Sequence, residues 1–257
     1  RKLTFLALLA TVGAAQAQNI LGELYLTAGD QGTIWVLQGS GVHDSWAMVS
    51  ATREYPIAVT KTVRTIGGLD PEGGSEYTLD GSFTGTSYAW PGTITSAWDG
   101  TTNGQNNFVV DFGTGAIFQM NTDWTNPTSL FKLGTATNYL GITYDFTDNS
   151  FWVSGWNLGV VEHYAMNGTF LGGFNTPFNN ISCLALDHIN GTLWMGSQGQ
   201  QGTFFQYSKD GEHIYTQIFP ELVNQNTLGG ECQAVPEPAT IFALGLGLLG
   251  LARLRRK

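Results

Sequence analysis

Hydrophobic residues alternate with small or polar residues in short segments along most of the chain, and each segment ends in Gly, Asn, Asp or Ser. Residues 140–144 show this pattern clearly, and turn-forming residues follow at 145–150. Alternation with a period of two predicts a β-strand with one buried face. The next segments predict three more strands, over residues 151–153, 160–164 and 169–171. Asn167-Gly168, between the last two segments, is typical of a tight β-hairpin turn.

This four-strand pattern repeats along the chain. Three anchors recur after 42 or 43 residues: Asp145 with Asp187, Trp152 with Trp194, and Tyr164 with Tyr207. Weaker copies lie around residues 24–36, 57–81 and 97–121, which makes about five units between residues 18 and 235. In these copies we expect Asp99 to match Asp145, and Trp35 to match Trp152 and Trp194 in the second strand of the unit.

Four strands in about 40–45 residues correspond to one blade of a β-propeller. The sequence therefore predicts an all-β fold, a β-propeller of about five four-stranded blades, with six blades as the other count. A β-sandwich is the alternative architecture, although its strands need no 42-residue period. The element Tyr-x-x-Asp/Asn-Gly, which begins at Tyr77, Tyr164 and Tyr207, also resembles extracytoplasmic propellers related to NHL and streptogramin-lyase-like repeats.

The N-terminal end has the three parts of a secretory signal peptide. Arg1-Lys2 is followed by an apolar stretch over 3–12 and by the small-residue site Ala15-Gln-Ala17. We expect residues 1–17 to be a signal peptide that directs export, and residues 18–234 to form the propeller-like domain.

The C-terminal end has its own arrangement of segments. Pro236-Glu237-Pro238 precedes an apolar run over 239–252, and the chain closes with four basic residues, Arg253, Arg255, Arg256 and Lys257. As a helix the run would be about 21 Å long, short of the roughly 30 Å hydrocarbon core, so it could span only where the bilayer thins. The basic residues would keep their end in the cytoplasm.

This order of Pro-Glu-Pro, apolar helix and basic cluster resembles the PEP-CTERM sorting signal of Gram-negative bacteria. The resemblance implies that residues 235–257 hold the exported chain transiently in the inner membrane and that an exosortase processes this tail. The protein would then reach the cell surface or the extracellular space. In that family the signal usually accompanies exopolysaccharide or biofilm-matrix production, which makes exopolysaccharide a candidate partner.

The charge of the chain excludes one class of partner. The formal net charge is −9, and most basic residues lie in the two ends. Between the ends only five basic residues face 19 acidic ones, a net charge of −14. Such a domain repels nucleic acid and other polyanions unless divalent cations bridge the two.

The sequence offers little catalytic chemistry. It has no nucleophile elbow, phosphate loop or dinucleotide fingerprint, and its four His residues have no zinc-site spacing. We therefore name no catalytic residue, no metal ligand and no cofactor, although Asp145, Asp148 and Asn149 have the residue types of a calcium site. Cys183 and Cys232 are expected to form a disulfide in an exported chain, with two free thiols as the alternative.

Four tryptophans lie in loops rich in Gly, Asn and Thr, namely Trp46, Trp90, Trp124 and Trp156. Exposed aromatic rings could stack on sugars, and packing within the loops is the alternative. The leading hypothesis is an exported, non-enzymatic protein, structural or glycan-associated, of the extracellular matrix. The competing hypothesis is a polysaccharide lyase or hydrolase whose site lies in the central channel of the propeller.

Overall fold

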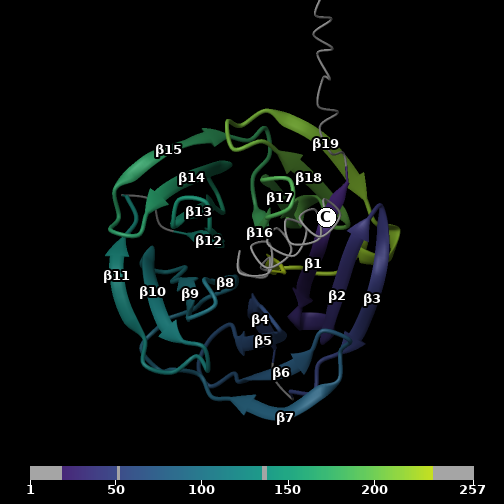
Figure 1. Ribbon diagram of the computed structural model, residues 1–257, viewed down its shortest axis with the longest axis vertical. Coiled ribbons are helices and arrows are strands. Elements are labelled where there is room, and N and C mark those ends of the chain that lie inside the picture. The colour runs from purple at the N-terminus through teal and green to yellow at the C-terminus, as the bar shows by residue number, and fades with distance from the viewer. Residues whose placement is uncertain (1–18, 51–52, 135–137, 234–257) are drawn as a thin grey trace, which may run out of the picture.

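The computed structural model describes residues 19–50, 53–134 and 138–233, and its strands surround a central axis like the blades of a propeller (Figure 1). In these residues the strands form five antiparallel sheets of four strands each. The predicted all-β propeller with five blades is therefore confirmed. The predicted signal peptide and the sorting segment lie outside the described residues. Within the described ranges, no helix is both long enough and apolar enough to cross a membrane.

The blades follow one another in chain order around the axis. From the axis outwards, blade 1 comprises β20 (Gly229–Cys232), β1 (Ile20–Ala28), β2 (Thr33–Gly39) and β3 (Gly41–Ala47). In the same direction, blade 2 comprises β4 (Glu54–Val59), β5 (Thr62–Gly67), β6 (Gly74–Thr78) and β7 (Phe83–Tyr88). Blade 3 comprises β8 (Gly100–Thr102), β9 (Asn106–Val110), β10 (Ala116–Asn121) and β11 (Thr128–Lys132).

The last two blades contain the strongest sequence repeats. Blade 4 comprises β12 (Tyr139–Asp145), β13 (Ser150–Gly155), β14 (Val160–Ala165) and β15 (Phe170–Asn175). Blade 5 comprises β16 (Ile181–Asp187), β17 (Thr192–Ser197), β18 (Thr203–Tyr207) and β19 (His213–Ile218). The described residues also include three short 3-10 turns, η1 (Gly29–Gln31), η2 (Gln198–Gln200) and η3 (Pro220–Leu222).

The two ends of the domain close the ring together. β20, from the end of the chain, pairs antiparallel with β1, so that Leu24 lies opposite Cys232 and Thr27 opposite Gly229. β1 is therefore the second strand of its blade, and β2 is the third. The expectation that Trp35 matches Trp152 and Trp194 was wrong, because Trp35 lies in β2 whereas the other two lie in second strands.

The expected match between Asp99 and Asp145 was also wrong, by four residues. Tyr144 N donates to Thr101 Oγ1, and Leu186 N donates to Thr143 Oγ1, so the same contact recurs one blade later. Thr101 thus matches Thr143, which places Asp99 two residues ahead of the inner-strand threonine and not at the end of the strand.

Antiparallel strands place successive turns at opposite ends of each blade, which defines two faces. The linker face carries the connections between blades and the turns between second and third strands. The terminus face carries the other turns. Each inner strand starts at the linker face, so the inner strand β20 ends at the terminus face. Its antiparallel neighbour β1 therefore begins at the terminus face.

Apolar side chains fill the spaces within and between the blades. Trp152 in β13 and Trp194 in β17 are both buried, as the 42-residue spacing predicts. Gly168 and Gly211 have φ angles of 83° and 86°, the left-handed conformation that a tight hairpin turn requires.

Candidate functional site

The central axis is closed by a buried carboxylate from the linker before blade 3. Asp99 Oδ1 accepts hydrogen bonds from the backbone N–H groups of Gly100 and Gly230, at 2.9 and 2.8 Å. Asp99 Oδ2 accepts two more, from Ile142 and Leu184, both at 3.1 Å. One side chain thus joins the inner strands of blades 1, 3, 4 and 5. Burial raises the pKa of Asp99. Its four partners are all hydrogen-bond donors, and they favour the ionised carboxylate and so oppose this effect.

A second buried acid lies in the next layer of the axis. Glu231 accepts hydrogen bonds from Thr101 Oγ1 at 2.8 Å and from Thr143 Oγ1 at 3.4 Å. Burial and the charge of Asp99 raise the pKa of Glu231. Threonine hydroxyls can accept as well as donate, so they also suit a protonated acid. These partners suit a protonated Glu231 better than a protonated Asp99, whose four partners can only donate.

Half-buried aromatic rings cover the axis on the linker face, and we call them the aromatic mouth: Trp98, Phe112 and Trp156. They pack on a buried layer formed by Tyr55, Leu140 and Leu228. The ring centroids of Phe112 and Trp156 lie 6.4 Å apart, and those of Tyr55 and Trp98 lie 5.2 Å apart, both with edge-to-face geometry. The mouth has an apolar floor, and the acids of the axis lie sealed beneath it.

Backbone hydrogen bonds hold the mouth in place across blade boundaries. Asn138 N donates to Phe112 O at 3.0 Å, and Trp156 N donates to Asn138 O at 2.8 Å. In the next blade Asn180 N donates to Trp156 O at 2.6 Å. Asn138 and Asn180 lie 42 residues apart, and both have left-handed φ angles, 70° and 57°, which asparagine tolerates well. The repeat thus places amide side chains next to the rings of the mouth.

A peripheral hollow on the linker face has a different character. Its volume is about 510 Å³, and its lining includes Asp30, Arg53 and Glu72. Arg53 donates to Glu72 Oε1 at 2.8 Å and contacts Asp30 Oδ1 at 3.5 Å. The charges of this hollow are therefore paired within the chain.

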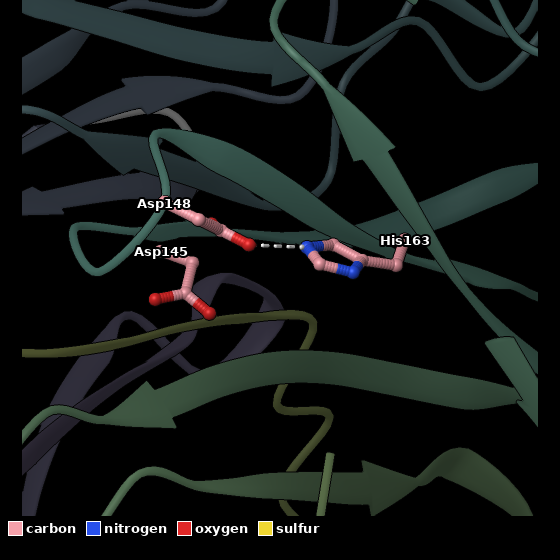
Figure 2. A group of neighbouring side chains, drawn as sticks. All are labelled: Asp145, Asp148 and His163. Carbon is pink, nitrogen blue, oxygen red and sulfur yellow. Dashed lines mark ion pairs between the residues drawn. The ribbon is translucent and has the colours of Figure 1, made fainter. Parts of the chain in front are cut away.

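On the terminus face of blade 4, two acids and a histidine come together. Figure 2 shows Asp148 and His163 facing each other, with Asp145 beside them. His163 Nε2 lies 3.4 Å from Asp148 Oδ2 and 2.5 Å from Ser150 Oγ, which also donates to Asp148. Burial lowers the pKa of His163, which favours the neutral ring. The ring stacks on Trp152, with centroids 4.1 Å apart.

This group has the residue types of a metal site, but Asp145 is already paired with a lysine. One ligand atom each of Asp145, Asp148 and His163 lie within 4.8 Å of one another. Asp145 Oδ2, however, lies 2.5 Å from the ammonium of Lys209 in blade 5 and accepts a bond from Trp152 Nε1 at 3.2 Å. A metal ion here would have to displace Lys209. As placed, the group is an ion-paired connection between blades 4 and 5.

This connection predicts a pH-dependent stability. Burial would raise the pKa of Asp145, but the bonds from Lys209 and Thr147 lower it to about 2. The folded-state pKa is thus below the unfolded one, so the stabilisation is complete above about pH 4 and is lost as the pH falls towards 2. We expect Lys209→Met to lower the free energy of unfolding by about 1–2 kcal/mol at pH 7. Urea denaturation from pH 2 to 7 measures this difference.

The control is Lys132→Met, an exposed lysine with no ion pair among the described residues. It should unfold like the unaltered protein at every pH. A Lys209→Met difference that persists at pH 2 would show that packing, not charge, connects the two blades.

The structure separates the four loop tryptophans. Trp124 is 0% exposed and lies in an apolar cluster with Ile66, Val109 and Met120, so the structure has the packing alternative for this ring and not an exposed sugar contact. Trp90 is half-buried against the same cluster as Trp124, and Trp46 is half-buried against another cluster. Trp156 alone of the four belongs to the mouth.

Trp98 and Phe112 complete the mouth, although their sequence context did not single them out. The 42-residue period offered one signal, because Trp98 stands one period before Leu140 at the start of an inner strand. Once the repeat is assigned so that Thr101 matches Thr143, Trp98 falls at the start of an inner strand, next to the axis.

The two cysteines lie in one apolar cluster between blades 1 and 5. Cys183 is in β16 and Cys232 is in β20, and both are buried free thiols. The structure thus has the alternative, two free thiols, in place of the predicted disulfide. Burial raises the pKa of both thiols, which makes them poor nucleophiles.

The sequence that follows the propeller indicates how the protein is sorted. Residues 234–257 match the family described as the PEP-CTERM protein-sorting motif. The chain carries this sorting signal. The PEP-CTERM motif supports export, processing by exosortase and membrane-associated sorting towards the cell surface. No curated protein matches the sequence.

Solved structures share the fold at low sequence identity. A chain from a nidogen–laminin complex has a TM-score of 0.57 at 15% identity, over 82% of this chain and 98% of that one. A protein of unknown function from Desulfotomaculum acetoxidans has a TM-score of 0.50 at 13% identity, over 84% and 89%. A streptogramin B lyase has a TM-score of 0.45 at 14% identity, over 79% and 70%. The first two likenesses concern the propeller fold and not the activity of this chain.

Proposed function

We propose that the propeller is a non-catalytic glycan-binding module of the cell surface or extracellular matrix, and that the aromatic mouth is its binding surface. The observation that carries this proposal is the half-buried rings of Trp98, Phe112 and Trp156 over the axis. The apolar faces of sugar rings stack on such side chains, which lose little conformational entropy on binding.

The polar groups beside the rings also suit a glycan. Asn138, Asn180 and Gln198 are half-buried next to the mouth, and Gln198 Nε2 donates to Asn226 Oδ1 at 2.7 Å. Amide groups both donate and accept, as sugar hydroxyls do. With 19 acidic residues against five basic ones between the two ends, a neutral or cationic glycan fits better than an anionic one.

The lyase or hydrolase is the second candidate, and the axis is the place where it would act. A catalytic channel needs titratable groups that a substrate can reach. Asp99 and Glu231 are fully buried beneath the mouth and hold their partners within the chain. This sealing supports binding over turnover as the role of the linker face.

A glycan array with the released protein tests the proposal. We expect Trp156→Ala to weaken binding of any glycan that is retained by about tenfold, since an aromatic contact contributes roughly 0.5–1.5 kcal/mol beyond its buried area. Isothermal titration with the best glycan measures this change, and thermal unfolding confirms that the variant is folded.

Phe170→Ala serves as the matched control, because Phe170 is an exposed aromatic residue of the outer strand β15, far from the axis. It should bind like the unaltered protein. Equal affinity of the Trp156 variant would contradict the proposal. Shortening of a polysaccharide by the unaltered protein would favour the enzyme instead.

A further inference from the structure

Three large apolar side chains are exposed together on the terminus face. Leu21 near the start of β1 is 42% exposed, Phe146 after β12 is 39% exposed, and Ile189 after β16 is 60% exposed. A Cβ atom on Gly22 would lie 4.0 Å from Ile189 Cδ1, and the ring of His188 packs edge-on against Phe146 at 5.0 Å. Leu21, Phe146 and Ile189 therefore lie near one another across blades 1, 4 and 5, and we call these three side chains the apolar patch.

One buried acid accepts hydrogen bonds from the backbone beneath the patch. The carboxylate of Asp187 accepts hydrogen bonds from Leu21 N at 2.7 Å and from Gly22 N at 3.2 Å. The same carboxylate accepts a bond from Ile189 N at 3.0 Å. Two side chains of the patch are thus fixed side by side and directed outwards. A preformed apolar surface of this kind is typical of an interaction site.

The chain leaves the propeller at this same face. β20 ends at Cys232, and Gln233 N donates to Glu23 O at 3.0 Å. The sorting motif begins at residue 234, and its apolar run begins at residue 239. The six residues 233–238 can span at most about 20 Å when fully extended. While the run is held in a membrane, the terminus face therefore stays next to the bilayer.

We propose that the apolar patch contacts the lipid bilayer surface while the sorting motif holds the chain in the membrane. Burial of the patch in the interface supplies the attraction. The charged neighbours, Lys209 and Asp148, are of opposite sign, and Asp210 and Glu212 lie farther out on the same face. The contact thus fits lipids without net charge better than anionic ones.

This orientation directs the linker face, with the aromatic mouth, away from the membrane. The membrane contact rests on the sorting motif and the patch, and not on glycan binding. Loss of one property therefore leaves the other in place, and the two are measured separately.

The test uses the full-length chain inserted through its sorting segment into phosphatidylcholine vesicles. Single cysteines are introduced at Ile189→Cys in the patch, at Leu158→Cys on the linker face and at Ser40→Cys, which is exposed on the terminus face outside the patch. An environment-sensitive fluorophore labels them selectively, because Cys183 and Cys232 are buried. Lipids that carry a spin label then quench any fluorophore in contact with the bilayer.

We expect blue-shifted emission at residue 189 and at least threefold stronger quenching there than at residues 40 and 158. Equal quenching at residues 189 and 40 would overturn the proposal, since the tether alone would explain it. A blue shift at residue 189 without quenching would also overturn it, because protein, such as a second copy of the chain, would then cover the patch. Should Ile189→Cys fail to fold, Phe146→Cys replaces it in the same comparison.

Discussion

Replacing Asp99 by asparagine is expected to lower the free energy of unfolding by about 3–5 kcal/mol, although the two side chains have nearly the same shape. Each carboxylate oxygen of Asp99 accepts two backbone N–H groups. An asparagine amide would direct its NH₂ group at two of these donors in either orientation. Urea denaturation at pH 7 measures the loss.

Glu231→Gln is the matched control on the same axis. The partners of Glu231 are threonine hydroxyls, which can turn to accept from an amide. The raised pKa of Glu231 favours its protonated form, which a glutamine resembles. We expect a loss of at most about 1 kcal/mol, the contribution of one ordinary hydrogen bond. Equal losses in the two variants would show that Asp99 does not act as an ionised acceptor.

Truncating Trp124 to alanine is expected to cost about 3–5 kcal/mol, the range for removing a fully buried aromatic side chain. The ring lies between blades 2 and 3, where Ile66, Val109 and Met120 surround it. The Trp124 backbone has a left-handed φ angle of 62°, which directs this loop residue into the core. Thermal or chemical denaturation of the released protein provides the measurement.

Two further variants put that cost in context. Trp194→Ala should lose a similar amount, because Trp194 is also fully buried. Trp156→Ala should lose clearly less, since its ring is only partly buried at the mouth. A Trp124 variant as stable as the Trp156 variant would mean that the loop ring does not support the core.

The sequence by itself determined the strands, the repeat and the sorting segment. Alternating side chains reach opposite faces of a strand, so a period of two is visible without any partner strand. The spacing of Trp152 and Trp194 reports a blade, because equivalent positions face equivalent neighbours. The order of Pro236-Glu237-Pro238, apolar run and basic end is likewise local, and the PEP-CTERM match bears it out.

Which strand of each repeat lies at the axis was decided only by the way the ring closes. β20 supplies the inner strand of blade 1, which moves β1 and Trp35 outwards by one strand. Asp99 reaches Gly230 across 131 residues, Leu184 across 85 and Ile142 across 43. No local pattern encodes such contacts, since they depend on how blades far apart in the chain meet at the axis.

Contacts between distant blades also decide which tryptophans are buried and which side chains form the candidate surfaces. Trp124 and Trp156 have similar loop surroundings in the sequence, but the first turns into an interface between blades and the second lies over the axis. The aromatic mouth and the apolar patch each combine side chains from several blades. Composition and periodicity determine which residues form strands, whereas the tertiary structure decides which loops share a face and therefore which side chains are free to bind.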